Sequence, residues 1–71
     1  MPRYKQDSPS LRLTRPSRVV MLTFGGRQTW TAPAGEVFPF SFEVERNDSF
    51  VIVQSGLSHY VLEAGAVEME G

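Results

Sequence analysis

Apolar and polar residues alternate along residues 37–54, the stretch with the richest apolar content in the chain. Apolar residues occupy every second position of its first half: Phe38, Phe40, Phe42 and Val44. A period of two is typical of a strand with one apolar face. Asn47-Asp48 favours a tight reversal with positive φ, and residues 50–54 return as a β-branched run. The pattern predicts a β-hairpin that holds the centre of the hydrophobic core.

A turn at Asn47-Asp48 predicts the register of this hairpin, with Val44 opposite Val51 and Phe42 opposite Val53. The residues that then share the core face are Phe40, Phe42, Val44, Val51 and Val53. Phe50 and Ile52 fall on the other face, so the returning strand is apolar on both faces. Such a strand either lies between two layers or uses its second face as an interface.

Shorter patterns predict four more strands. An apolar run at residues 19–24 and an alternating run at residues 27–32 flank Gly25-Gly26, as in a second hairpin. Residues 57–62 and 66–70 alternate again. The sequence therefore predicts an all-β fold, a small barrel or sandwich of about six short antiparallel strands. Pro39 lacks an N–H, which predicts an edge position or a bulge for its strand.

Residues 1–18 differ from the rest of the chain in composition and charge. They contain Pro2, Pro9 and Pro16, which disfavour a helix, and their only aliphatic residues are Leu11 and Leu13. Their net charge is +4, whereas residues 19–71 carry −5. We therefore expect residues 1–18 to be an extended basic N-terminal arm that orders on a neighbour, and residues 19–71 to be a compact β-domain.

The length of 71 residues and the absence of cysteine limit how the fold is stabilised. A chain of this length buries only about 60% of its unfolded surface, so small domains usually add a disulfide, a metal or a partner. Without cysteine, neither a disulfide nor a cysteine-based zinc site is available. Nor does any apolar run approach the ~20 residues that span a bilayer. We expect protein partners and no membrane.

Candidate catalytic residues have simpler structural explanations. His59 is the one histidine, and no serine lies in a Gly-x-Ser-x-Gly context. Glu43 and Glu45 are about 7 Å apart by strand rise, as in paired glycosidase carboxylates, but a domain this small offers no ordinary substrate cleft. Gly25-Gly26 precedes neither a lysine nor a helix, so it is no phosphate loop. The sequence predicts no catalytic residue, no metal, no cofactor and no small-molecule substrate.

Contacts with a partner are expected from the arm and from the tryptophan. The predicted partner-binding residues are Leu11, Arg12, Leu13, Arg15, Arg18 and Trp30. The leucines suit a groove or a sheet edge and the arginines suit carboxylates, while tryptophan is enriched at binding hot spots. The same arginines, with Tyr4, are compatible with nucleic acid. The acidic body repels a polyanion, so protein is the preferred partner.

The run Thr29-Trp30-Thr31-Ala32-Pro33-Ala34-Gly35 resembles a segment of phage tail-fibre and receptor-binding modules. The whole chain, with its arm, its β-body and no cysteine, is similar to small phage capsid decoration or cement proteins. The resemblance implies a non-enzymatic virion structural protein, assembled in the host cytoplasm, that cements a capsid or joins tail components. Its partners would be major capsid or tail proteins and copies of itself. The alternatives are a small nucleic-acid-binding β-barrel and an inhibitor of a host protein.

Overall fold

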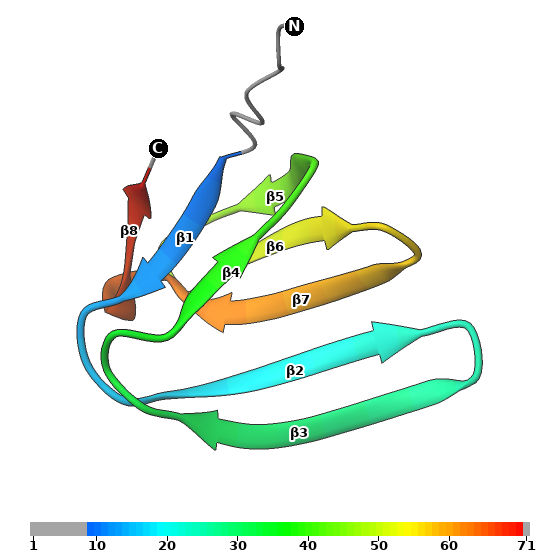
Figure 1. Cartoon of the computed structure of the whole chain (residues 1–71), viewed down its shortest axis with the longest axis horizontal. Helices are drawn as coiled ribbons and strands as arrows, with labels where there is room; N and C mark the ends of the chain where they lie inside the picture. The colour runs from blue at the N-terminus through cyan, green and yellow to red at the C-terminus, as the bar shows by residue number, and fades with distance from the viewer. Residues whose placement is uncertain (1–8, 71) are drawn as a thin grey trace, which may run out of the picture.

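The computed structural model describes residues 9–70, in which eight strands form two antiparallel sheets (Figure 1). The larger sheet has the order β3 (Gly26–Ala32), β2 (Ser17–Thr23), β7 (Ser58–Glu63), β6 (Phe50–Ser55) and β5 (Phe42–Arg46). The smaller sheet has the order β4 (Val37–Pro39), β1 (Ser10–Leu13) and β8 (Val67–Glu70). One 3₁₀ turn, η1 (Ala64–Ala66), joins β7 to β8. Residues 1–8 of the predicted arm lie outside the described residues.

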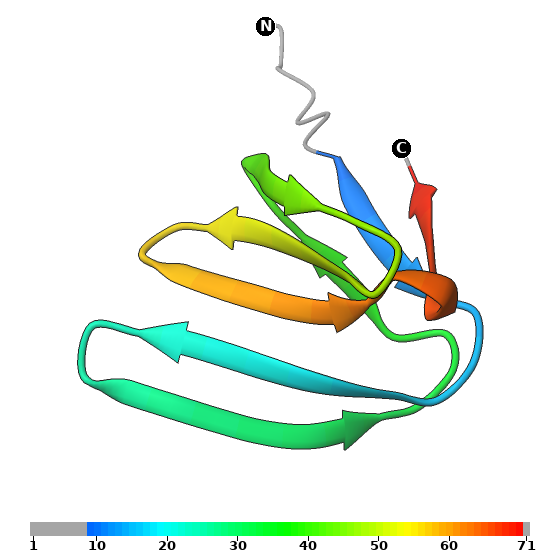
Figure 2. The same ribbon diagram turned by 180° about the vertical axis from the view of Figure 1, so that it is seen from behind.

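The two sheets pack face to face and enclose the core, and their strands cross rather than run side by side (Figures 1 and 2). The five-stranded sheet contributes Val19, Ala32, Val51, Val53 and Leu62 to the core. The three-stranded sheet and its connections contribute Leu11, Leu13, Phe38, Phe40 and Ala66. Phe38 also meets Tyr60 edge to face, with ring centroids 5.3 Å apart. The predicted all-β class is confirmed, with eight strands instead of about six.

The first strand, β1, corrects the predicted boundary at residue 18. It is the central strand of the three-stranded sheet and pairs with both β4 and β8. Its end is fixed on two sides, because the Leu13 N–H donates to Glu36 O, the Gly35 N–H donates to Leu13 O, and the Thr14 N–H donates to Ala66 O. The fold therefore begins no later than Ser10, and residues 10–18, which composition assigned to a separate arm, are part of the domain.

The predicted central hairpin is divided between the two sheets. β4 pairs with β1, whereas β5 pairs with β6, and the chain passes from one sheet to the other at Phe40 and Ser41. Phe40 is buried at this corner, where its N–H donates to Pro9 O. Pro39 ends the edge strand β4, as its missing N–H predicted.

The register predicted for β5 and β6 is wrong. Phe42 is opposite Gln54, Arg46 is opposite Val51, and a bulge at Val44 interrupts the pairing between Glu43 and Glu45. The loop after Arg46 is held by the Asn47 side chain, whose Oδ1 accepts the N–H groups of Ser49 and Phe50. No described residue other than glycine has a positive φ. The longer loop and the bulge therefore shift the register that a two-residue turn would impose.

The second predicted hairpin is confirmed, and the predicted strand at residues 57–62 forms a further one. β2 and β3 pair from Ser17 opposite Ala32 to Thr23 opposite Gly26, around a turn at residues 24–25. β6 and β7 pair around a turn at Gly56, which has a φ of 64° that favours glycine. β8 also matches the predicted terminal strand within one residue. These elements were predictable because their alternation and their turn residues lie close together in the sequence.

Candidate interaction surface

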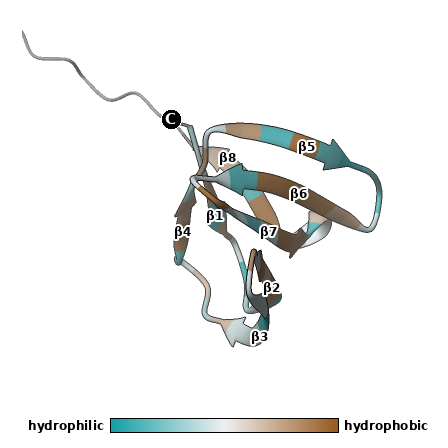
Figure 3. Ribbon diagram, turned by 90° about the vertical axis from the view of Figure 1, so that its right-hand side faces the viewer, coloured by the Kyte–Doolittle hydropathy of each residue, from teal (hydrophilic) through white to brown (hydrophobic). Residues whose placement is uncertain are grey.

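One face of the five-stranded sheet is turned away from the three-stranded sheet, and we call it the outer face. Side chains alternate along a strand, so the neighbours of the buried Val19, Leu62 and Val51 point to the outer face. The register places three of these outer residues side by side on β2, β7 and β6: Val20, Val61 and Ile52. We call them the outer row. All three are partly exposed, and in Figure 3 most of β6 is coloured as hydrophobic.

A shallow recess of about 140 Å³ lies beside the outer row. It is lined by Arg18, Val20, Phe50, Val61, Leu62 and Glu63. Ligand pockets usually enclose about 300–1,000 Å³, so this recess fits an apolar side chain of a partner better than a cofactor or a substrate. The outer row and the recess are adjacent on an exposed sheet face.

The charged end of the recess is organised by Glu63. Its Oε2 accepts the backbone N–H of Arg18 at 3.4 Å, and its Oε1 lies 4.0 Å from Arg15 Nη2. Both positions are at the surface, where such contacts add little stability. Glu63 therefore places one carboxylate beside an apolar recess, which gives the surface a polar rim of the kind found around protein interfaces.

Exposed apolar residues also lie at one end of the five-stranded sheet. The β2–β3 and β6–β7 turns lie at the same end in both Figure 1 and Figure 2, in agreement with the pairing of Leu22 with His59. Phe24 and Leu57, in these turns, have 100% and 91% of their surface exposed. The two hairpin tips therefore each carry one exposed apolar side chain.

The two leucines predicted to bind a partner are instead core residues. Leu11 and Leu13 retain only 1% and 0% of their surface. The reason is that β1 has neighbouring strands on both sides and places alternate residues against the larger sheet. A leucine buried in its own domain cannot enter the groove of a partner, so this assignment is corrected.

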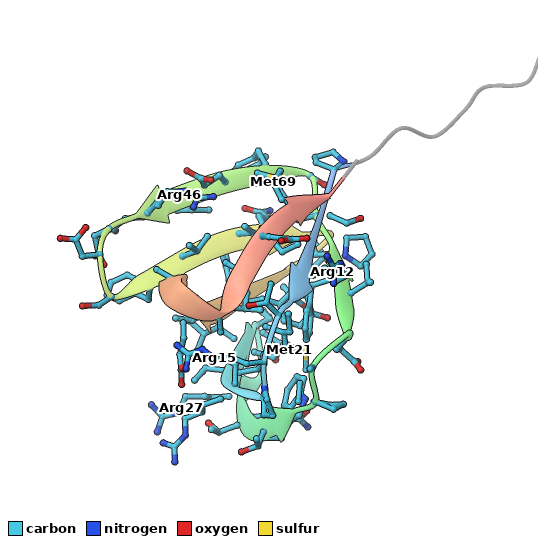
Figure 4. All side chains as sticks on the ribbon, turned by 90° about the vertical axis from the view of Figure 1, so that its left-hand side faces the viewer. Arg12, Arg15, Met21, Arg27, Arg46 and Met69 are labelled. Atoms are coloured by element: carbon cyan, nitrogen blue, oxygen red, sulfur yellow. The ribbon has the colours of Figure 1, made fainter. Side chains whose placement is uncertain are left out.

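The three arginines predicted to bind a partner do not form one basic surface. Arg12 alternates with the buried leucines and so faces away from the core, where it forms an ion pair with Glu68 of β8. Arg15 and Arg18 lie instead beside Glu63. Figure 4 shows Arg12 and Arg15 well apart. The charges are therefore divided between two regions, each with a carboxylate of the same chain.

Trp30, the last predicted contact residue, lies on β3 at the edge of the larger sheet. It pairs with the buried Val19, so its side chain points to the core side of the sheet, and yet 36% of its surface is exposed. Its position at an edge explains this partial burial. Trp30 remains available to a partner that approaches along β3.

The candidate catalytic residues lie on two strands, Glu43 and Glu45 on β5 and His59 on β7. His59 is the second residue of strand β7, where it is paired with Leu22 on one side and Gln54 on the other. Glu43 forms an ion pair with Arg46, whose Nη2 donates to Glu43 Oε1 at 2.8 Å, and this hydrogen bond lowers the pKa of Glu43. The described residues contain no cluster of three or more histidine or acidic side chains able to hold a metal.

The outer row was only partly foreseen in the sequence. The two apolar faces of β6 predicted either a second layer or an interface for Phe50 and Ile52, whereas the places of Val20 and Val61 beside them depend on the order of the strands.

Within residues 9–70, no helix is both long and apolar enough to cross a bilayer.

In comparisons with known proteins, no family model, curated protein or solved structure matches the chain.

Proposed function

We propose that the protein is a non-catalytic structural module that binds a larger protein assembly through the outer face of its five-stranded sheet. The observation that carries the proposal is the outer row, three partly exposed aliphatic side chains on adjacent central strands. The solvated face of an antiparallel sheet is expected to carry mainly polar side chains. Contiguous exposed apolar surface on a small domain indicates a contact surface.

The setting that we propose is a phage virion, in which the module would decorate a capsid or join tail components. This setting rests on the resemblance of residues 29–35 to tail-fibre modules and of the whole chain to decoration proteins. An apolar sheet face with a recess for a single side chain supports attachment to a protein surface. Nucleic-acid binding has less support, because Arg12 and Arg15 lie apart and each lies near a carboxylate.

A pair of matched valine substitutions tests the proposal. Val61→Glu places a charge in the outer row, whereas Val37→Glu places the same charge on β4, where Val37 is exposed in the other sheet. The labelled proteins are mixed with DNA-free virion shells that lack the protein and, separately, with short single-stranded oligonucleotides. We expect the parent and Val37→Glu to sediment with the shells and Val61→Glu to stay in solution.

Two results would contradict the proposal. Equal shell binding by both variants would show that the outer row is not the contact surface. Tight oligonucleotide binding that weakens steeply with salt, without shell binding, would favour the nucleic-acid alternative. Circular dichroism of both variants shows whether the fold is retained in the comparison.

A further inference from the structure

The two sheets have four edge strands, and three of them carry features that oppose pairing with another chain. β4 has only three residues and ends in Pro39, β5 is interrupted by the bulge at Val44, and β8 is a four-residue strand that carries Glu68. Proline, bulges, charges and short length are the usual protections of a sheet edge. β3 has no proline, no bulge and no shortening: its seven residues pair with β2 without a break, and its one charged residue is Arg27.

The backbone of β3 has donors and acceptors available on its open side. In an antiparallel hairpin with a two-residue turn, the pair that closes the turn exchanges both hydrogen bonds, and so does every second pair after it. Thr23 and Gly26 close this turn. It follows that Arg27, Thr29 and Thr31 direct their N–H and C=O groups away from β2. Among the described strands, β2 is the one that pairs with β3.

The open side of β3 is self-complementary. When two copies are antiparallel and centred on Thr29, Thr29 faces Thr29 of the second copy and Arg27 faces Thr31. All three residues exchange both backbone hydrogen bonds in this register, which gives about six bonds between the copies. Opposed threonines are a favourable cross-strand pair, and opposed like charges are not. The two Arg27 side chains lie about 14 Å apart along the strands, beyond the screening length of about 8 Å.

The remaining side chains of β3 also fit this register. Gln28 of one copy faces Trp30 of the other, so the pairing covers the indole ring that the edge leaves partly exposed. Figure 4 shows Arg27 projecting away from the body of the protein. Neither face of the pair therefore brings like charges or a proline into opposition.

We propose that two copies of the chain pair through β3 to form one continuous ten-stranded sheet centred on Thr29. The association ends at two copies, because the outer strands of the joined sheet are then the bulged β5 strands. Directly opposed residues of an antiparallel pair point to the same side, so both outer faces are turned in one direction. Such a dimer presents two outer rows to one partner surface, and binding gains from avidity.

The absence of cysteine from the chain makes a direct test of the register available. In the proposed dimer the Cα atoms of the two Thr29 residues are about 5.5 Å apart, within the range that a disulfide bridges. The two Thr31 residues are about 14 Å apart and cannot be bridged. We expect Thr29→Cys to form a covalent dimer under mild oxidation. Thr31→Cys, the matched control, should remain a monomer band on a non-reducing gel.

A charge exchange at the same position tests the dimer without chemical cross-linking. Thr29→Lys and Thr29→Glu each oppose like charges at the centre, and we expect each to weaken self-association about tenfold or more. An equimolar mixture opposes lysine to glutamate and should restore the dimer. Sedimentation velocity at about 0.1 mM protein measures all three samples and the parent. Thr29 is exposed, so both variants keep the fold, which circular dichroism verifies.

Several results would overturn the proposal. A parent protein that is monomeric at this concentration, with no Thr29→Cys cross-link, excludes the dimer, and cross-linking of Thr31→Cys excludes the register. Species larger than a dimer exclude closure at β5. The outer row is a separate surface: Val61→Glu should still dimerise while losing shell binding. Loss of the dimer with intact dependence on Val61 would therefore leave the proposed function standing.

Discussion

Strand β1 buries both of its leucines, whereas Phe42 and Val44 in strand β5 keep 53% and 48% of their surface exposed. Each strand carries two large apolar residues, so the residue types alone do not explain the difference in burial. β1 has a strand on each side and the larger sheet against one face. β5 is an edge strand with one neighbour, and its bulge breaks the alternation of its side chains. Burial in this fold therefore depends on the position of a strand in its sheet more than on its apolar content.

Among the variants that compare β1 with β5, deleting residues 1–13 should lower the stability of the fold most. The deletion removes β1, so β4 and β8 lose their shared partner and Val19, Val51 and Leu62 lose their cover. We expect no cooperative thermal unfolding in the far-ultraviolet circular dichroism signal. Deleting residues 1–8, the matched control, retains every described strand and should keep a cooperative transition. A folded 14–71 fragment would show that β1 is dispensable, as a separate arm would be.

Leu13→Ala should have the next largest effect. Leu13 is fully buried, and large-to-small substitutions of this kind cost about 2–5 kcal/mol of unfolding free energy. The total stability of small domains is about 5–15 kcal/mol. Urea unfolding measures the loss. A change below about 0.5 kcal/mol, the usual size for surface substitutions, would place Leu13 outside the core.

Phe42→Ala should cost much less, although its alternation with Phe40 and Val44 predicted a buried ring. Full burial of a phenylalanine contributes about 1.5–3 kcal/mol, and roughly half of the Phe42 surface is exposed. We therefore expect a loss of about 1 kcal/mol in the same urea experiment. A loss larger than that of Leu13→Ala would reverse the comparison between the two strands.

The smallest effect concerns the ion pair of β5. Arg46 donates two hydrogen bonds to Glu43 Oε1, which holds the pKa of Glu43 below its usual value of 4.5. A lowered pKa adds stability above the pKa of the unfolded chain, and this contribution is lost as the pH falls through the folded value. Arg46→Gln should raise the titration midpoint of Glu43 toward 4.5 in a carboxyl NMR titration. An unchanged midpoint would contradict the assigned cause.

Local patterns made part of the fold predictable, and long-range pairing explains what was missed. The β2–β3 and β6–β7 hairpins follow from alternation and glycine turns close together in the sequence. β1 was assigned to an arm because two leucines between prolines cannot order a segment alone. It is ordered by pairing with residues 37–39 and 67–70, which are distant in the sequence. The bulge at Val44 shifts the register between β5 and β6, and the alternation of apolar residues does not reveal a bulge.

The candidate surfaces were predictable to a similar extent. The second apolar face of β6 predicted either a second layer or an interface at Phe50 and Ile52, but only the strand order brings Val20 and Val61 beside them. The open edge of β3 depends on the same order, since a strand is an edge only when no other strand follows it in the sheet. The residue types were visible in the sequence, whereas their neighbours were not.

The pairing of β1 with β8 has a consequence for how the chain folds. It joins Ser10 to Glu70 across almost the whole described chain, and closing so long a loop must precede the contacts that stabilise it. During synthesis on the ribosome, the hairpins can form early. β1 cannot pair with β8 until later, because β8 is the last of the eight strands to be synthesised. We therefore expect slow folding for a domain of this length, with the apolar inner face of the larger sheet exposed to aggregation until β8 pairs with β1.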